Sequence, residues 1–473
     1  MANLSQVPST TRSRAVGSRG VLIIVCAGVV LASLDLFIVN VALPQIAKGL
    51  GATSLSSLSW IMNAYAIVYA SLLVYFGRLA DRFSRDRAFL IGVAIFTASS
   101  AACAASNSVA MLVAFRVVQA AGAALLTPTS LSLVLATSPS ERRGGAVRAW
   151  TAVGGASAAL GPVVGGFLVA LDWRWVFLVN VPVGIIAFVA GLIYLPRVRG
   201  EGGEHPDPWG ALLATGGIAT LTFALVQSNS WSAWSTALTL LVAFAILALF
   251  VWHTLVSPRP LVAPSLFRSR HFVGASAVGL LFSLAFAAML LSLSLWEQDV
   301  WHWTALRSGL AIAPGPLMVP LLAFLVTGRL IARYGPGLVM ALGGGVFAAG
   351  VAWWAVSITA RPNYSHSVLG GIILTGVGVG LSLPTMMSTA STALAPSAFA
   401  TGSAVINMIR QTGLALGVAV LISVLGTPTM SRPFTLGDFR HGWWLTAAFS
   451  LSSVVPALWL LPRTAARDVR GAP

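Results

Sequence analysis

Apolar runs of about twenty residues recur along the whole chain, and each is long enough to cross a bilayer as a helix. Only 8% of the residues are charged, whereas a soluble domain would carry about a quarter. Fourteen spans are expected, at 21–43, 57–77, 88–107, 110–133, 146–170, 176–196, 209–228, 235–256, 272–296, 308–330, 337–358, 367–388, 402–425 and 442–462. Their connections are too short for a soluble domain, so the sequence predicts an all-α membrane protein with one polytopic body.

The basic residues predict the orientation of these spans. With a cytoplasmic N-terminus, twenty arginines fall on the cytoplasmic side and six basic residues on the outer side, while Arg116 and Arg410 lie within spans. This positive-inside bias predicts that both termini are cytoplasmic. It also accounts for the net charge of +16 without nucleic acid, and the expected surroundings are the lipid bilayer.

Short motifs repeat between the two halves of the chain. Residues 77–82 resemble 328–333, and 124–129 resemble 380–385, both at an offset close to 250 residues. Such a parallel repeat is typical of transporters that bind substrate between two halves. The expected parts are a cytoplasmic tail (1–20), a six-helix bundle (21–196), a linker with two inserted spans (197–271), a second six-helix bundle (272–462) and a cytoplasmic tail (463–473).

Asp35 is the one acidic residue deep inside an apolar run. Because a carboxylate there costs at least ~2.5 kcal/mol, it needs a function or a partner. Arg116 lies at a similar depth in the fourth run, roughly 10–12 Å below the outer surface. Alternating access would change the solvation of Asp35 and its distance from arginine, so the pair could bind and release a proton. The alternative is a static ion pair that only orders the bundle.

Several motifs carry a resemblance to a known family. The loop Gly77-Arg-Leu-Ala-Asp81-Arg82-Phe-Ser-Arg85-Asp-Arg87 resembles the signature loop of the major facilitator superfamily, and Gly161-Pro162-Val-Val-Gly165-Gly166 resembles the antiporter motif of its drug exporters. Segments 34–44, 173–184 and 410–417 are similar to the fourteen-span drug–proton antiporters. The resemblance implies two six-helix bundles with two extra helices inserted between them.

The resemblance also implies roles for these motifs. The loop would latch the two halves together on the cytoplasmic side through Gly77, Asp81, Arg82, Arg85 and Arg87. The alternative is a solvated charge run that sets the topology. Gly161, Pro162, Gly165 and Gly166 would form a seal or pivot, since proline can kink a helix and glycine allows close approach. Ordinary small-residue packing is the alternative.

The expected substrate contacts are Asn40, Gln119, Asn407, Arg410 and Gln411. Arg410 either contacts the substrate or is capped by helix carbonyls. Glu297 and Asp299 end the ninth run among tryptophans that are expected to form an interfacial belt, and a role in substrate entry or coupling is open. The six histidines fall in loops or at interfaces, so neither a metal nor a cofactor is expected.

These observations predict a monomeric carrier of a bacterial inner membrane that exports an amphiphilic small molecule in exchange for protons. The scarcity of buried acids favours a neutral, monocationic or anionic cargo over a dication. An uptake symporter of the same fold is the alternative. A membrane enzyme or sensor is disfavoured because the sequence shows no catalytic constellation and no soluble output domain. No phosphate-binding loop precedes its one lysine, Lys48, which argues against ATP hydrolysis by the usual route.

Overall fold

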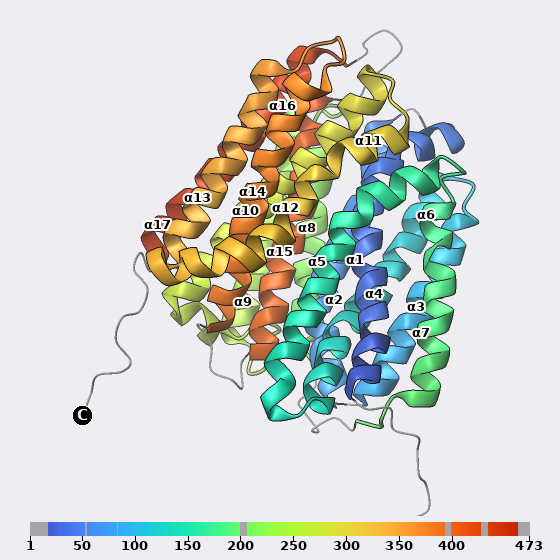
Figure 1. Ribbon diagram of the computed structural model, residues 1–473, viewed down its shortest axis with the longest axis vertical. Coiled ribbons are helices and arrows are strands. Elements are labelled where there is room, and N and C mark those ends of the chain that lie inside the picture. Colours follow the sequence, from blue (N-terminus) through green and yellow to red (C-terminus); the bar gives the residue numbers. More distant parts are fainter. Residues whose placement is uncertain are drawn as a thin grey trace, which may run out of the picture.

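The computed structural model describes residues 18–52, 54–82, 84–198, 206–392, 399–426 and 434–461. Long helices run side by side through this part of the chain (Figure 1). Thirteen helical segments are long and apolar enough to cross a membrane. The structure therefore confirms the all-helical membrane architecture, whereas the count of fourteen stays a prediction. The predicted tails lie almost wholly outside the described residues.

The first half follows the first six predicted runs. Its helices are α1 (Ser18–Gly49), α2 (Leu55–Arg82), α3 (Arg85–Ala104), α4 (Val109–Thr137), α5 (Ser140–Val169), α6 (Trp175–Leu178) and α7 (Asn180–Tyr194). For the fifth run, the part of α5 that is described as an apolar helix is Leu160–Val169.

The inserted helices are α8 (Pro208–Gln227) and α9 (Ala233–Val256), and a short helix, η1 (Pro264–Arg268), leads into the second half. That half contains α10 (Arg270–Leu295), η2 (Trp296–Val300), α11 (Ala305–Ile312), α12 (Pro314–Leu322), η3 (Ala323–Thr327), α13 (Gly328–Ser357), η4 (Tyr364–Val368), α14 (Leu369–Thr392), α15 (Phe399–Leu425), α16 (Leu436–Ser452) and α17 (Val454–Leu460). Gly335, with a φ of 78°, kinks α13 just before Pro336, where an L side chain would be strained.

The most extensive contacts between the halves are those of α2 with α15 and of α5 with α11 and α12. In Figure 1 the first half, blue to green, lies beside the second half, yellow to red, and the α11 end is at the top. By the charge pattern, this end is expected to face outward. The site described below comprises an ion pair inside the first half and a cavity where α1 and α2 meet α10 and α15.

Candidate functional site

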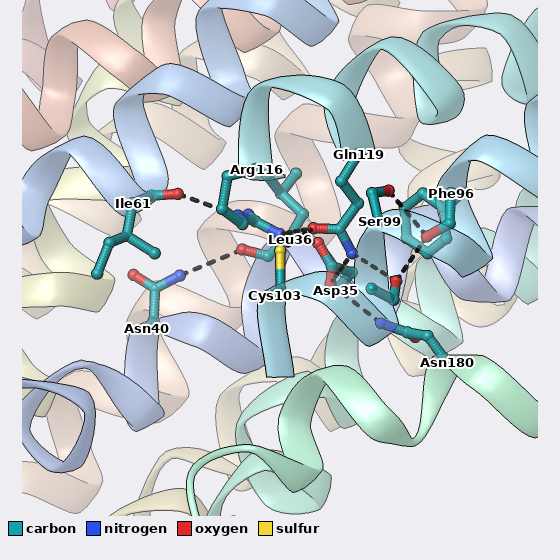
Figure 2. A network of polar contacts seen from close by, with 11 residues as sticks. Asp35, Leu36, Asn40, Ile61, Phe96, Ser99, Cys103, Arg116, Gln119 and Asn180 are labelled. Carbon is teal, nitrogen blue, oxygen red and sulfur yellow. Dashed lines mark hydrogen bonds and ion pairs between the residues drawn. The ribbon is translucent and has the colours of Figure 1, made fainter. Parts of the chain in front are cut away.

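Asp35 on α1 and Arg116 on α4 form an ion pair inside the first half (Figure 2). Their side chains are 0% and 1% exposed, respectively. The structure thus brings together the two residues that the sequence placed at similar depth. Because both charges are removed from water, each depends on the other and on nearby polar groups for compensation.

Two amides complete the surroundings of the Asp35 carboxylate. Gln119 Nε2 donates to Asp35 Oδ1 at 2.9 Å, and Asn180 Nδ2 donates to the same oxygen at 3.1 Å. Gln119 lies three residues after Arg116, so both project from one face of α4. The expected cavity residue Gln119 therefore belongs to the charge network, and Asn180, at the start of α7, was missed by the sequence reasoning.

Arg116 is held by further contacts from α2. Its Nε donates to the Ile61 carbonyl at 3.0 Å, and its guanidinium lies 4.0 Å from the centre of the Tyr65 ring. One of its terminal nitrogens also donates to Gln119 Oε1 at 2.7 Å. Gln119 in turn donates to Ser100 on α3 at 2.8 Å. The network therefore connects five helices of the first half, which makes it sensitive to any movement among them.

A small cavity of about 30 Å³ lies between the two halves. It is lined by Leu36, Phe37 and Asn40 of α1, Met62, Asn63 and Ala66 of α2, Phe286, Ala287 and Leu290 of α10, and Leu414, Ala415 and Val418 of α15. None of these lining residues is charged. A water molecule needs about 10–15 Å³ on this measure, so the cavity offers a space far smaller than a drug.

Asn63 is the least satisfied polar side chain of this cavity. It is 0% exposed, and neither its Oδ1 nor its Nδ2 has a hydrogen-bond partner among the described residues. Leaving such a group unpaired costs about 1–3 kcal/mol, which a ligand with both a donor and an acceptor would relieve. Asn40 makes only a long contact of 3.5 Å to the Leu36 carbonyl. Sequence reasoning missed Asn63, although an amide in an apolar run was a usable signal.

The other expected substrate contacts lie on α15. Gln411 is 1% exposed, and its Oε1 has no partner in the described part of the chain. It precedes the cavity-lining Leu414 by three residues, which places both on one helix face. Arg410 and Asn407 are half-buried and are not among the lining residues. Both interpretations of Arg410 therefore stay predictions.

Glycines of α5 bring three helices into unusually close contact. A Cβ atom at Gly165 would lie 2.9 Å from the Ile38 carbonyl oxygen of α1, and one at Gly161 would lie 2.7 Å from Phe37 Cβ. On the other side, a Cβ at Gly166 would approach the Ala305 oxygen of α11 to 2.5 Å. We call these contacts between α1, α5 and α11 the seal.

The seal is reciprocal between the halves. A Cβ at Gly309 of α11 would lie 2.3 Å from the Pro162 carbonyl oxygen of α5. Only glycine fits at such distances, because real Cβ atoms do not approach this closely. All four residues of the predicted antiporter motif therefore contact another helix at the end of the molecule that carries η2. Whether they act as a seal or a pivot during transport stays a prediction.

The described part of the loop at 77–87 contacts the linker. Val198 N donates to Asp86 Oδ1 at 3.0 Å, and Arg85 N donates to the Val198 carbonyl at the same distance. Arg78 donates to the Pro260 carbonyl at 2.7 Å. Among the predicted latch residues, Gly77 lies on α2, Arg85 is half-buried and Arg87 is exposed. The side chains of Asp81 and Arg82 lie outside the described residues, so the latch stays a prediction.

The tryptophans near Glu297 do not form a lipid-facing belt. Trp296, Trp301 and Trp303 are 0%, 5% and 7% exposed. Trp296 packs edge-on against Phe439 and Trp443 of α16, at centroid distances of 5.1 and 5.7 Å. The expectation of a belt is therefore wrong for these residues, because the turn at η2 directs them into the second half. Glu297 is buried with them, whereas Asp299 is exposed.

Comparison with known proteins gives concordant results. Residues 25–418 match the family model of the Major Facilitator Superfamily. The chain is 34% identical to the tetracenomycin C resistance and export protein of Streptomyces glaucescens, covering 90% of this chain and 78% of that protein. It is 33% identical to a cephamycin export protein of Amycolatopsis lactamdurans, covering 92% of each. A multidrug resistance protein B homolog of Mycobacterium tuberculosis is 34% identical, covering 84% and 74%.

Solved structures show the same fold at low sequence identity. A peptide transporter, POT, superposes with a TM-score of 0.69 at 17% identity, covering 94% of this chain and 96% of that one. The nucleoside transporter NupG gives a TM-score of 0.65 at 12% identity, covering 94% and 99%. The family model covers most of the chain, and the relatives above exceed 30% identity over most of its length. The chain belongs to the Major Facilitator Superfamily.

Proposed function

We propose that this protein is a fourteen-span exporter that exchanges an amphiphilic small molecule for protons by alternating access. Its membership of a transporter family and the resistance and export roles named for its relatives support transport rather than catalysis. The positive-inside bias supports an orientation with both termini in the cytoplasm of a bacterial cell membrane. The observation that carries the proposal is the buried Asp35–Arg116 pair.

The Asp35–Arg116 pair can couple proton binding to movement because neither partner can change alone. Protonation of Asp35 would leave Arg116 as a buried cation without its counter-ion, and breaking such a pair costs about 3–5 kcal/mol. The cost falls if Arg116 finds water or another partner. A proton on Asp35 therefore favours a different arrangement of α1, α2 and α4, which is the requirement for a coupled carrier.

Residues that line the cavity are sequence neighbours of residues that hold the ion pair, on both α1 and α2. Asp35 is followed by the lining residue Leu36, and Ile61, whose carbonyl accepts from Arg116, is followed by Met62. A substrate that spreads α1 and α2 would therefore displace the carboxylate and the carbonyl that hold the guanidinium. Substrate and proton would compete through this shared backbone, as exchange requires.

The cavity lining favours an uncharged cargo. Most of its side chains are aliphatic or aromatic, and the amides of Asn40 and Asn63 supply donors and acceptors without net charge. A cation would find no carboxylate among the lining residues, and leaving a buried charge unpaired is costly. We infer a neutral amphiphile whose polar edge hydrogen-bonds to these amides.

The test uses inside-out vesicles that are energised and loaded with a pH probe. Addition of a transported compound should release protons from wild-type vesicles and from Asp172→Asn, a change in an exposed surface acid. It should release none from Asp35→Asn, and Asp35→Glu should restore part of the signal. All four proteins must be present in the membrane in equal amount and elute as a single species in detergent. Undiminished proton release from Asp35→Asn would refute coupling at this carboxylate.

A further inference from the structure

Glu297 is a buried acid that the Asp35 network does not use. It lies in η2, is 0% exposed, and accepts a hydrogen bond from Ser308 Oγ on α11. Its other oxygen, Oε1, has no partner among the described residues, and no ion pair there includes it. A carboxylate so poorly compensated needs an explanation, because an ionised group without a counter-ion is costly to bury.

The charged and titratable groups in and near this turn come from several elements. Arg307 on α11 and Tyr364 on η4 interact with Glu297, whereas Lys48 at the end of α1 and His302 interact with Asp299, two residues after Glu297. Arg307 interacts with Glu297 over a distance, but its guanidinium lies over the Trp303 ring, 4.1 Å from the ring centre. The Tyr364 hydroxyl donates to the Ala311 carbonyl at 2.9 Å. From α16 the neighbours are aromatic, Phe439 and Trp443.

Glu297 lies between two sets of contacts that hold the halves together at the η2 end of the molecule. On one side, Gln298 Nε2 donates to the Val41 carbonyl of α1 at 3.0 Å, and Ser294 Oγ donates to the Asn40 carbonyl at 3.2 Å. On the other side, its partner Ser308 immediately precedes Gly309, which abuts Pro162 in the seal. The hydrogen bond between Glu297 and Ser308 therefore links η2, which contacts α1, to α11, which contacts α5 in the seal.

Because Glu297 is buried while the seal is closed, ionisation of Glu297 disfavours the closed seal, and closure disfavours ionisation. While the seal is closed, the carboxylate has one hydroxyl donor and no access to water, which penalises its charge. A neutral carboxyl avoids this penalty and can remain in place. Opening this end would admit water and remove the penalty, so ionisation and opening favour each other by linkage.

We propose that Glu297 is a second proton-binding residue that controls the seal from the outer side: protonation allows closure, and ionisation favours opening. This proposal rests on the orientation and alternating access of the proposed function. Its proton is taken from and returned to the outer solution, so it adds nothing to the net exchange. Glu297 is therefore a positioning residue for the seal, separate from the coupling pair.

The experiment measures opening of the seal through the rate at which a reagent in the outer solution labels a buried cysteine. In a background with Cys26→Ser and Cys103→Ala, Val41→Cys reports opening at this end of the molecule, since Val41 is 0% exposed, its carbonyl accepts from Gln298 and it lies three residues after Ile38 of the seal. Right-side-out vesicles are treated with a membrane-impermeant maleimide at several outer pH values. Each rate is divided by that of Ser230→Cys, an exposed position in the loop between α8 and α9, which removes the intrinsic pH dependence of thiol labelling.

The relative labelling of Val41→Cys should rise about 5-fold or more between about pH 5.5 and about pH 8. Adding Glu297→Gln, which mimics the protonated acid, should hold it low at every pH, whereas the exposed control Asp299→Asn should keep the full response. An unchanged response in Glu297→Gln would overturn the proposal. Asp35→Asn separates the two proposals: the response should survive in this variant even if proton release is lost, and its loss there alone would assign the switch to Asp35.

Discussion

The energetic dependence of Asp35 and Arg116 on each other can be measured with a double-mutant cycle. Asp35→Asn would replace the carboxylate by a neutral amide and leave Arg116 buried with neutral acceptors, among them the Ile61 carbonyl and Gln119 Oε1, but no counter-ion. Arg116→Met would leave the carboxylate with two amide donors and no cation. Removing one partner of a buried ion pair typically costs about 3–5 kcal/mol. The double variant removes both charges, so it should cost far less than the roughly 6–10 kcal/mol sum of the single changes.

Unfolding in mixed detergent micelles, titrated with a denaturing detergent, supplies the four free energies of unfolding. We expect a coupling energy of at least about 2 kcal/mol, well above the ~0.5 kcal/mol within which independent sites add. Gln119→Leu in the same background should reduce this coupling, because Gln119 bonds to both charges. Additive losses for Asp35→Asn and Arg116→Met would show that the two side chains do not compensate each other in the folded protein. The reasoning behind the coupling site would then fail.

Two further variants test the cavity and the seal. Gly165→Val should abolish transport without preventing insertion, because a Cβ at this position would lie 2.9 Å from the Ile38 oxygen. The control variant Gly345→Val should transport normally, because a Cβ there meets nothing within 4 Å. Equal transport by both variants would exclude close α1–α5 contact as a requirement. Asn63→Leu should stabilise the protein by about 1–3 kcal/mol by removing an unpaired buried amide, yet raise the KM for a neutral cargo in vesicle transport assays. A stabilised variant with an unchanged KM would remove Asn63 from the substrate site.

The stability predicted for Asn63→Leu illustrates how a binding residue differs from a structural one. Asp35 is well satisfied in the closed structure, and its replacement should destabilise the protein. Asn63 is unsatisfied, so its replacement should stabilise it. Unpaired buried polar groups such as the Asn63 amide lower stability. They are kept in a protein where they serve a function, since their hydrogen-bond partners are present only in another conformation or in a bound ligand.

The sequence alone predicted the membrane architecture, because a bilayer demands about twenty apolar residues with all backbone hydrogen bonds made inside the helix. It also singled out Asp35 and Arg116, since charges are rare at that depth. Their further partners, Gln119 and Asn180, come from helices distant in the sequence, and only packing shows that both amides reach one carboxylate oxygen. The burial of Glu297 likewise depends on how η2 turns its residues into the second half.

What each helix faces was decided by the tertiary structure. Within Ala233–Val256 and Arg270–Val300, an apolar 18-residue stretch has the same mean hydropathy of 2.3, yet 6% of the first stretch and 83% of the second is buried inside the protein. Sequence cannot separate them, because lipid tails are as apolar as leucine and accept the same side chains as a protein core. The spans could therefore be predicted from composition, whereas the cavity, the seal and the position of Glu297 follow from how the helices pack.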